Sequence, residues 1–164
     1  MITLNESEQK LSRFLAKMRH EQARAKGRTD KQIGPQSSEE TDLEGIGAEI
    51  AFCKLFNIYP DTEIGHTPDA DCILRTGERV DVKATRHTNG HLLAVPWKTD
   101  AVDLFALIIG TFPTYRLAGF MTSAELLQPT RLKDFGHGKG YAARQDELLQ
   151  LPTHLRGFLN SPHI

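Results

Sequence analysis

The sequence predicts an α/β fold in which a central mixed sheet of four to five strands is flanked by helices. Three segments support this prediction. Residues 71–83 alternate apolar and charged side chains on both sides of Gly77, which is typical of a β-hairpin. Residues 103–110 form a nearly continuous apolar run, which predicts a strand covered by helices on both faces of the sheet. Residues 43–57 repeat apolar side chains at helical spacing.

The N-terminal segment, residues 5–26, is expected to form a helix with a partial apolar stripe. Its other positions are rich in lysine and arginine, which suits an arm that contacts phosphates or a dimerisation helix. A solvated helix face fits the same charges equally well. Glycine, proline and serine then indicate a linker over residues 27–40, so that residues 1–38 form a basic helix and linker before the core.

The second predicted helix, residues 43–57, has Thr41 or Asp42 as its N-cap and carries Glu49 within its apolar stripe. A carboxylate in such a stripe is costly unless it is paired or binds a metal ion. The other interpretation is that Glu49 lies at the edge of the stripe and reaches solvent.

Two glycines near the start of this helix, Gly45 and Gly47, each weaken a helix by about 1 kcal/mol relative to alanine. Their presence predicts that another element packs closely against the helix start.

Within the predicted hairpin, a three-residue turn at residues 76–78 places Ile73 opposite Asp81 and Asp71 opposite Lys83. Two carboxylates and one ammonium then share a face within reach of one another. A two-residue turn would separate them, because a shift of one residue in register reverses every side chain. We expect the longer turn. An exposed hairpin whose charges are simply solvated is the alternative.

Two further strands are expected at residues 92–95 and 114–122, followed by a short helix that Ser123 caps. Together with the preceding helix and hairpin, these elements make a core over residues 42–127. Residues 128–164 are polar and irregular, which predicts a C-terminal loop with short helices.

The composition predicts one globular domain: 164 residues, 39% of them hydrophobic and 25% charged. The net charge of -1 gives no overall attraction to nucleic acid, so affinity for DNA must come from local patches. Two cysteines in apolar settings, no membrane-length apolar run and no visible signal peptide predict a cytoplasmic protein without a membrane partner. Residues 136–140 lack the spacing of a phosphate-binding loop, so no nucleotide cofactor is expected.

The order of the acidic residues resembles the PD-(D/E)xK nuclease superfamily. Glu49 on a predicted helix is followed by Pro68-Asp69-Ala70-Asp71 and then by Asp81-Val82-Lys83. The likeness extends over residues 42–121, about half of the chain. It implies a restriction endonuclease-like core.

The resemblance also implies a metal site. Mg²⁺, with Mn²⁺ as a substitute, would be held by three carboxylates and one backbone carbonyl, those of Glu49, Asp71, Asp81 and Val82. Lys83 would complete the catalytic set. Asp69 is the alternative to Asp71 as a ligand.

The implied activity is that of a Mg²⁺-dependent DNA nuclease, which hydrolyses phosphodiester bonds with a metal-activated water. Four side chains near the predicted site are candidate DNA contacts: Arg86, His87, Lys98 and Lys139. Paired cuts would favour a homodimer. The main alternative is a DNA-binding or assembly module that keeps the fold without cleaving. A hydrolase of small phosphoesters, which would need a closed pocket, is another.

Overall fold

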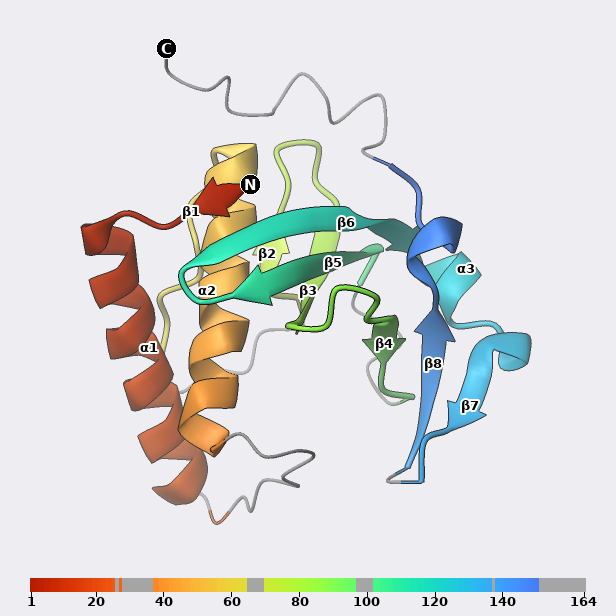
Figure 1. Cartoon of the computed structure of the whole chain (residues 1–164), viewed down its shortest axis with the longest axis horizontal. Coiled ribbons are helices and arrows are strands. Elements are labelled where there is room, and N and C mark those ends of the chain that lie inside the picture. Colours follow the sequence, from red (N-terminus) through yellow and green to blue (C-terminus); the bar gives the residue numbers. More distant parts are fainter. Residues whose placement is uncertain (26, 28–36, 65–69, 97–101, 137, 151–164) are drawn as a thin grey trace.

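The computed structural model describes residues 1–25, 27, 37–64, 70–96, 102–136 and 138–150. Two long helices lie on one side of a sheet, and a smaller sheet lies on its other side (Figure 1). In chain order the elements are β1 (Ile2–Thr3), α1 (Glu6–Ala25), α2 (Ser38–Phe56), β2 (Cys72–Ile73), β3 (Arg79–Thr85), β4 (Leu92–Ala94), β5 (Leu104–Thr111), β6 (Thr114–Thr122), α3 (Ser123–Leu126), η1 (Pro129–Arg131), β7 (Leu132–Asp134), β8 (Lys139–Ala143) and η2 (Gln145–Glu147).

The larger sheet has five strands in the order β1-β6-β5-β3-β2. Strands β3 and β5 run parallel, with Val82 beside Ala106, and the other neighbours run antiparallel. The predicted central mixed sheet flanked by helices is therefore confirmed. The sequence does not predict β1, because two residues are too few for an alternating pattern.

Strand β5 is buried on both faces, as its apolar run predicts. Ala106 and Ile108 belong to the core under α1 and α2, whereas Phe105 and Leu107 belong to a second core under β4, β8 and α3. This second face is covered by a small sheet and the short α3 rather than by helices alone. The difference arises because the connection from β3 to β5 contains β4, which pairs with β8.

The two long helices pack side by side (Figure 1). Helix α1 matches the predicted N-terminal helix and buries Leu15, Ala16 and His20. The ammonium of Lys54 in α2 lies 2.8 Å from the carboxylate of Glu8 in α1. Within the described residues, no helix is long and apolar enough to cross a membrane.

Helix α2 begins at Ser38 rather than at residue 43. The Ser37 hydroxyl accepts a hydrogen bond from the Glu40 N–H at 3.2 Å, and the Glu40 carboxylate accepts one from the Ser37 N–H at 3.0 Å. The prediction of Thr41 or Asp42 as the N-cap is wrong, because this reciprocal capping box stabilises an earlier start.

Close packing against the start of α2 occurs at only one of the two predicted glycines. A Cβ atom at Gly47 would overlap the Tyr115 hydroxyl and lie 2.9 Å from the Phe112 ring. At Gly45, no atom of the described residues lies within 4 Å of the corresponding position. The packing prediction is thus confirmed for Gly47 and wrong for Gly45.

The described part of the C-terminal region contains the predicted short helices, as η1 and η2, but between them it forms a β-hairpin where a loop was predicted. Strand β7 pairs with β8, and β8 pairs with β4, which makes a three-stranded sheet. The sequence hides β8 because this strand contains one glycine and two alanines rather than β-branched residues. Thr122, rather than Ser123, caps α3. Residues 151–164 lie outside the described part of the chain.

Candidate active site

The β2–β3 hairpin has a three-residue loop, but the loop lies one residue earlier than predicted. The Leu74 N–H donates to the Glu78 carbonyl at 2.9 Å, and Ile73 lies opposite Arg79. The predicted pairings of Ile73 with Asp81 and of Asp71 with Lys83 are therefore both wrong. The loop moves because Gly77, with φ of 100°, closes it as its third residue. Each residue of β2 is therefore paired with a residue of β3 two positions earlier than predicted. Because side chains alternate with a period of two, every side chain stays on its predicted face of the hairpin.

The corrected register brings Asp71 next to Asp81. The Asp71 N–H donates to the Val80 carbonyl at 3.0 Å, and the Asp71 carboxylate accepts the Val82 N–H at 2.7 Å. A residue in a strand directs its N–H and C=O to the same side. The carbonyl of Val82 therefore points to the same sheet edge as the carboxylate of Asp71.

The protonation of Glu49 in α2 is influenced by the negative charges of Asp71 and Asp81. Its side chain is 19% exposed. Burial, the negative charge of Asp71 and, less strongly, that of Asp81 together raise the pKa of the Glu49 carboxyl to about 8, against the opposing effect of Arg19. The charges of Asp71, just before β2, and of Asp81 in β3 therefore both act on the carboxyl group of Glu49 in α2.

Asp81 and Lys83 form an ion pair on the face of β3 that points away from the long helices. Val80 and Val82 pack into the core on the helix side, so the alternating residues face the opposite way. The Lys83 ammonium lies 2.5 Å from the Asp81 carboxylate, and the two side chains are 28% and 1% exposed. The ammonium compensates a charge that is almost completely removed from water.

Arg19 of α1 is a site residue that the sequence does not single out. Its guanidinium lies 3.1 Å from the Glu49 carboxylate and 3.6 Å from that of Asp61, and it donates to the Asp61 carbonyl. In the sequence it is one of many basic residues in the N-terminal helix. Its role depends on how α1 crosses α2, which no local pattern encodes.

The donor groups at this edge fit Mg²⁺ by their chemistry, because carboxylate and carbonyl oxygens are the ligands that this hard cation prefers. Among the residues that the structure describes, no three acidic, histidine or cysteine side chains are gathered into a formed metal site. Glu49 and Asp81 instead each bind a cation of the chain itself, Arg19 and Lys83.

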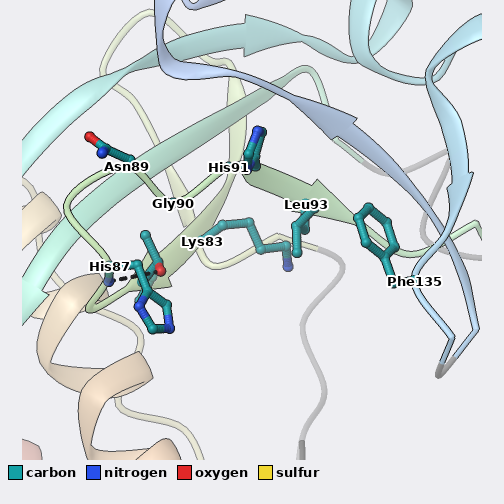
Figure 2. Close-up of a pocket in the computed structure, with 9 residues that line it drawn as sticks. Lys83, His87, Asn89, Gly90, His91, Leu93 and Phe135 are labelled. Carbon is teal, nitrogen blue, oxygen red and sulfur yellow. Dashed lines mark hydrogen bonds between the residues drawn. The ribbon is translucent and has the colours of Figure 1, made fainter. Parts of the chain in front are cut away.

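Two surface pockets adjoin these residues. One of about 740 Å³ is lined by Asp61, Asp71 and Ile73 among others. Another of about 490 Å³ is lined by Lys83 and His87 among others (Figure 2). Both are open surface features whose lining residues are in large part exposed, in contrast to the closed pocket that a hydrolase of small phosphoesters would need.

The predicted DNA contacts lie in different settings. The guanidinium of Arg86 lies 3.5 Å from the Glu44 carboxylate, and this ion pair reduces its availability for a phosphate. His87 and Lys139 are exposed. Lys98 and the alternative ligand Asp69 lie outside the described residues.

Comparisons of the chain with known protein families, curated proteins and solved structures found no match, so the likeness to PD-(D/E)xK nucleases depends on the residues described above.

Proposed function

We propose that this protein is a Mg²⁺-dependent nuclease that hydrolyses phosphodiester bonds of DNA. The observation that supports this function most directly is that the Asp71 carboxylate accepts the Val82 N–H at 2.7 Å, between Asp81 and Lys83, which form an ion pair. The raised pKa of Glu49, whose causes include burial and the charges of Asp71 and Asp81, agrees with it. Carboxylates that repel one another in a partly buried position destabilise a protein unless a cation compensates them. Perturbed acidic groups of this kind concentrate in functional sites.

The proposed ligands of the ion are the carboxylates of Glu49, Asp71 and Asp81 and the carbonyl of Val82. When bound, Mg²⁺ supplies activation of water and neutralisation of charge on the phosphate. Mn²⁺ is expected to substitute, because it accepts the same oxygen ligands.

Lys83 is proposed to bind the substrate phosphate or to orient the attacking water. Its ammonium already lies in the site, 2.5 Å from Asp81, and its side chain is also part of a pocket wall. The flexible four-carbon side chain allows the ammonium to exchange the carboxylate for a phosphate oxygen without movement of β3.

Arg19 is proposed to position Glu49. Its hydrogen bond to the carboxylate favours the ionised form, which is the form that binds a metal ion. Arg19 also binds Asp61 of the segment that follows α2, so a single side chain orients groups from two parts of the chain.

The experiment that tests this function is incubation of the purified protein with linear, nicked, branched and single-stranded DNA, with Mg²⁺, Mn²⁺ or EDTA. The wild type is expected to cut at least one substrate only when metal is present. Asp81→Ala and Lys83→Ala are expected to reduce the rate at least a hundredfold. Asp146→Ala and Lys17→Ala are matched controls, because their side chains are 68% and 73% exposed and lie in other elements.

The variants also separate the alternatives. Full activity of Lys83→Ala would refute the role given to Lys83. Salt-dependent binding of DNA without cleavage of any substrate would instead favour a binding or assembly module. Sedimentation of the protein with and without DNA tests the predicted homodimer.

A further inference from the structure

The pocket of about 490 Å³ beside Lys83 has an apolar end and a polar end (Figure 2). Figure 2 shows the Lys83 side chain extending toward Leu93, with Phe135 on the far side of Leu93. Leu93 and Phe135 are 43% and 45% exposed, and both line this pocket. The remaining lining residues include His87, Asn89 and His91, whose side chains can form hydrogen bonds.

The ring of Phe135 lies against the backbone of the smaller sheet. A Cβ atom at Gly140 of β8 would lie in ordinary van der Waals contact with this ring, at 3.6 Å, and in tighter contact with the Ala94 carbonyl, at 3.2 Å, so the ring lies beside the strand. The Phe135 N–H also donates to the Gly138 carbonyl at 3.1 Å in the β7–β8 turn.

The opposite wall is also packed. A Cβ atom at Gly90 would lie 2.5 Å from Thr85, and the Gly90 N–H donates to the His87 carbonyl at 2.8 Å. The Gln145 side chain from η2 donates to the Gly90 carbonyl at 2.9 Å and to the Thr88 carbonyl at 2.7 Å. The loop that contributes the polar groups is therefore fixed from two directions.

These properties match the chemistry of a nucleobase. A base has an apolar π face that stacks on an aromatic side chain and a polar edge that forms hydrogen bonds. The pocket volume lies within the usual range for sites that bind small organic groups. Lys83 lies at the boundary between this pocket and the acidic residues, so a base in the pocket would adjoin a phosphate at the site.

We infer that this pocket binds an unpaired nucleobase next to the phosphodiester bond that is cleaved. The inference rests on the proposed nuclease function, which it makes more specific. A paired base cannot enter, because both of its faces are stacked and its edge is paired with the other strand. The preferred substrate is then single-stranded DNA, or a duplex with an unpaired nucleotide at the cleavage point.

The test compares the binding of two short oligonucleotides of equal charge. One is an oligothymidylate, and the other has the same sugar-phosphate backbone without bases. Dissociation constants are measured in EDTA by fluorescence anisotropy. The wild type is expected to bind the oligothymidylate about tenfold more tightly, because stacking of a base on an aromatic side chain contributes an effect of this size.

Phe135→Ala is expected to lose most of this preference, and Phe135→Tyr to keep it. Leu93→Ala is also expected to reduce the preference. Because Leu93 belongs to β4, a loss in this variant cannot be caused by distortion of the β7–β8 turn that contains Phe135. Phe14→Ala is the matched control, because Phe14 is also a large exposed aromatic residue, 55% exposed, but belongs to α1. The control is expected to retain the wild-type preference, and thermal melts verify that each variant is folded.

The inference is overturned if the wild type binds both oligonucleotides equally, or if Phe135→Ala keeps the preference. An equal loss in Phe14→Ala would also overturn it. The proposed nuclease activity is tested independently of this pocket, because it predicts cleavage in the presence of Mg²⁺, whereas the binding test contains no metal ion. Cleavage without a base preference would reject the pocket alone, and a base preference without cleavage would reject the nuclease alone.

Discussion

Arg19 of α1 donates a hydrogen bond of 3.1 Å to the carboxylate of Glu49 in α2. Arg19 favours the ionised form of this carboxylate, while burial and the charges of Asp71 and Asp81 favour the protonated form. The second group of effects is stronger, since the pKa of Glu49 is about 8. Most Glu49 side chains therefore carry a proton at neutral pH when no metal ion is bound.

The binding of Mg²⁺ should therefore be coupled to loss of a proton from Glu49. The affinity for Mg²⁺ is expected to rise as pH increases toward about 8, because the ion binds the ionised carboxylate. Isothermal titration calorimetry in buffers of different ionisation enthalpy would measure the released proton. In Glu49→Gln, binding should be weaker and this proton release should disappear. A wild-type affinity that does not change between pH 6 and pH 8 would contradict the prediction.

The same shift has a consequence for the stability of the metal-free protein. The pKa of Glu49 is raised from 4.5 to about 8 in the folded state, so the folded protein binds this proton more tightly than the unfolded chain. The resulting contribution of protonated Glu49 to the free energy of unfolding is complete below pH 4.5. This contribution is lost as pH rises through about 8, by an amount on the order of a few kcal/mol. We expect urea denaturation in EDTA to show a wild-type free energy of unfolding that falls with pH relative to that of Glu49→Gln. Parallel pH profiles for the two proteins would be the contrary result.

Replacement of Arg19 should move the pH dependence of metal binding upward. Without the guanidinium, one of the effects that lower the pKa of Glu49 is removed, so a higher pH is needed to ionise it. Titrations of Arg19→Met with Mg²⁺ at several pH values would measure the displacement. Arg24→Met is the control, because Arg24 is an exposed arginine near the end of the same helix. Equal profiles for both variants would exclude the positioning role of Arg19.

The ion pair of Asp81 and Lys83 should be important for stability as well as for cleavage. Asp81 is 1% exposed, so Lys83→Met removes the ammonium partner of an almost fully buried carboxylate. This loss typically costs about 3 kcal/mol. In a double-mutant cycle, Asp81→Asn in the Lys83→Met background should restore part of the lost free energy of unfolding, because the charge is then removed too. Additive effects would show that the two groups are not coupled.

The two glycines of α2 should respond to alanine in opposite directions. Gly47→Ala is expected to destabilise the protein by about 1–3 kcal/mol, because its Cβ atom would overlap Tyr115 and crowd Phe112. Gly45→Ala is expected to stabilise it by up to about 1 kcal/mol, since the helix gains propensity and nothing among the described residues obstructs the new atom. Thermal or urea denaturation of both variants makes the comparison. Destabilisation of equal size at both positions would contradict it.

The predictions from sequence succeeded where a pattern is repeated along one element. The apolar run of β5 and the alternation of the hairpin set which residues are buried and which side chains share a face, and both are confirmed. The position of the hairpin loop was wrong by one residue, because three-residue loops over residues 75–77 and 76–78 keep the same alternation. Only the hydrogen bonds of Leu74 decide between them.

The acidic cluster was predictable in part. Glu49 was recognisable as a carboxylate within an apolar stripe, and Asp71 and Asp81 as charges on one face of a hairpin. Arg19 was not recognisable, because nothing in its neighbourhood distinguishes it from the other basic residues of α1. The pocket residue Phe135 was also hidden, since it follows a three-residue strand in a segment with weak β propensity.

The sequence by itself determined the α/β class, the elements that bear the three acids and the side of the hairpin on which two of them lie. These features depend on interactions between residues close in the chain, whose spacing is directly visible. The tertiary structure decided that Arg19 meets Glu49, that Lys83 and Phe135 line one pocket and that a second sheet covers β5. Each of these depends on how distant elements pack, and packing is selected by the free energy of the whole fold rather than by a local pattern.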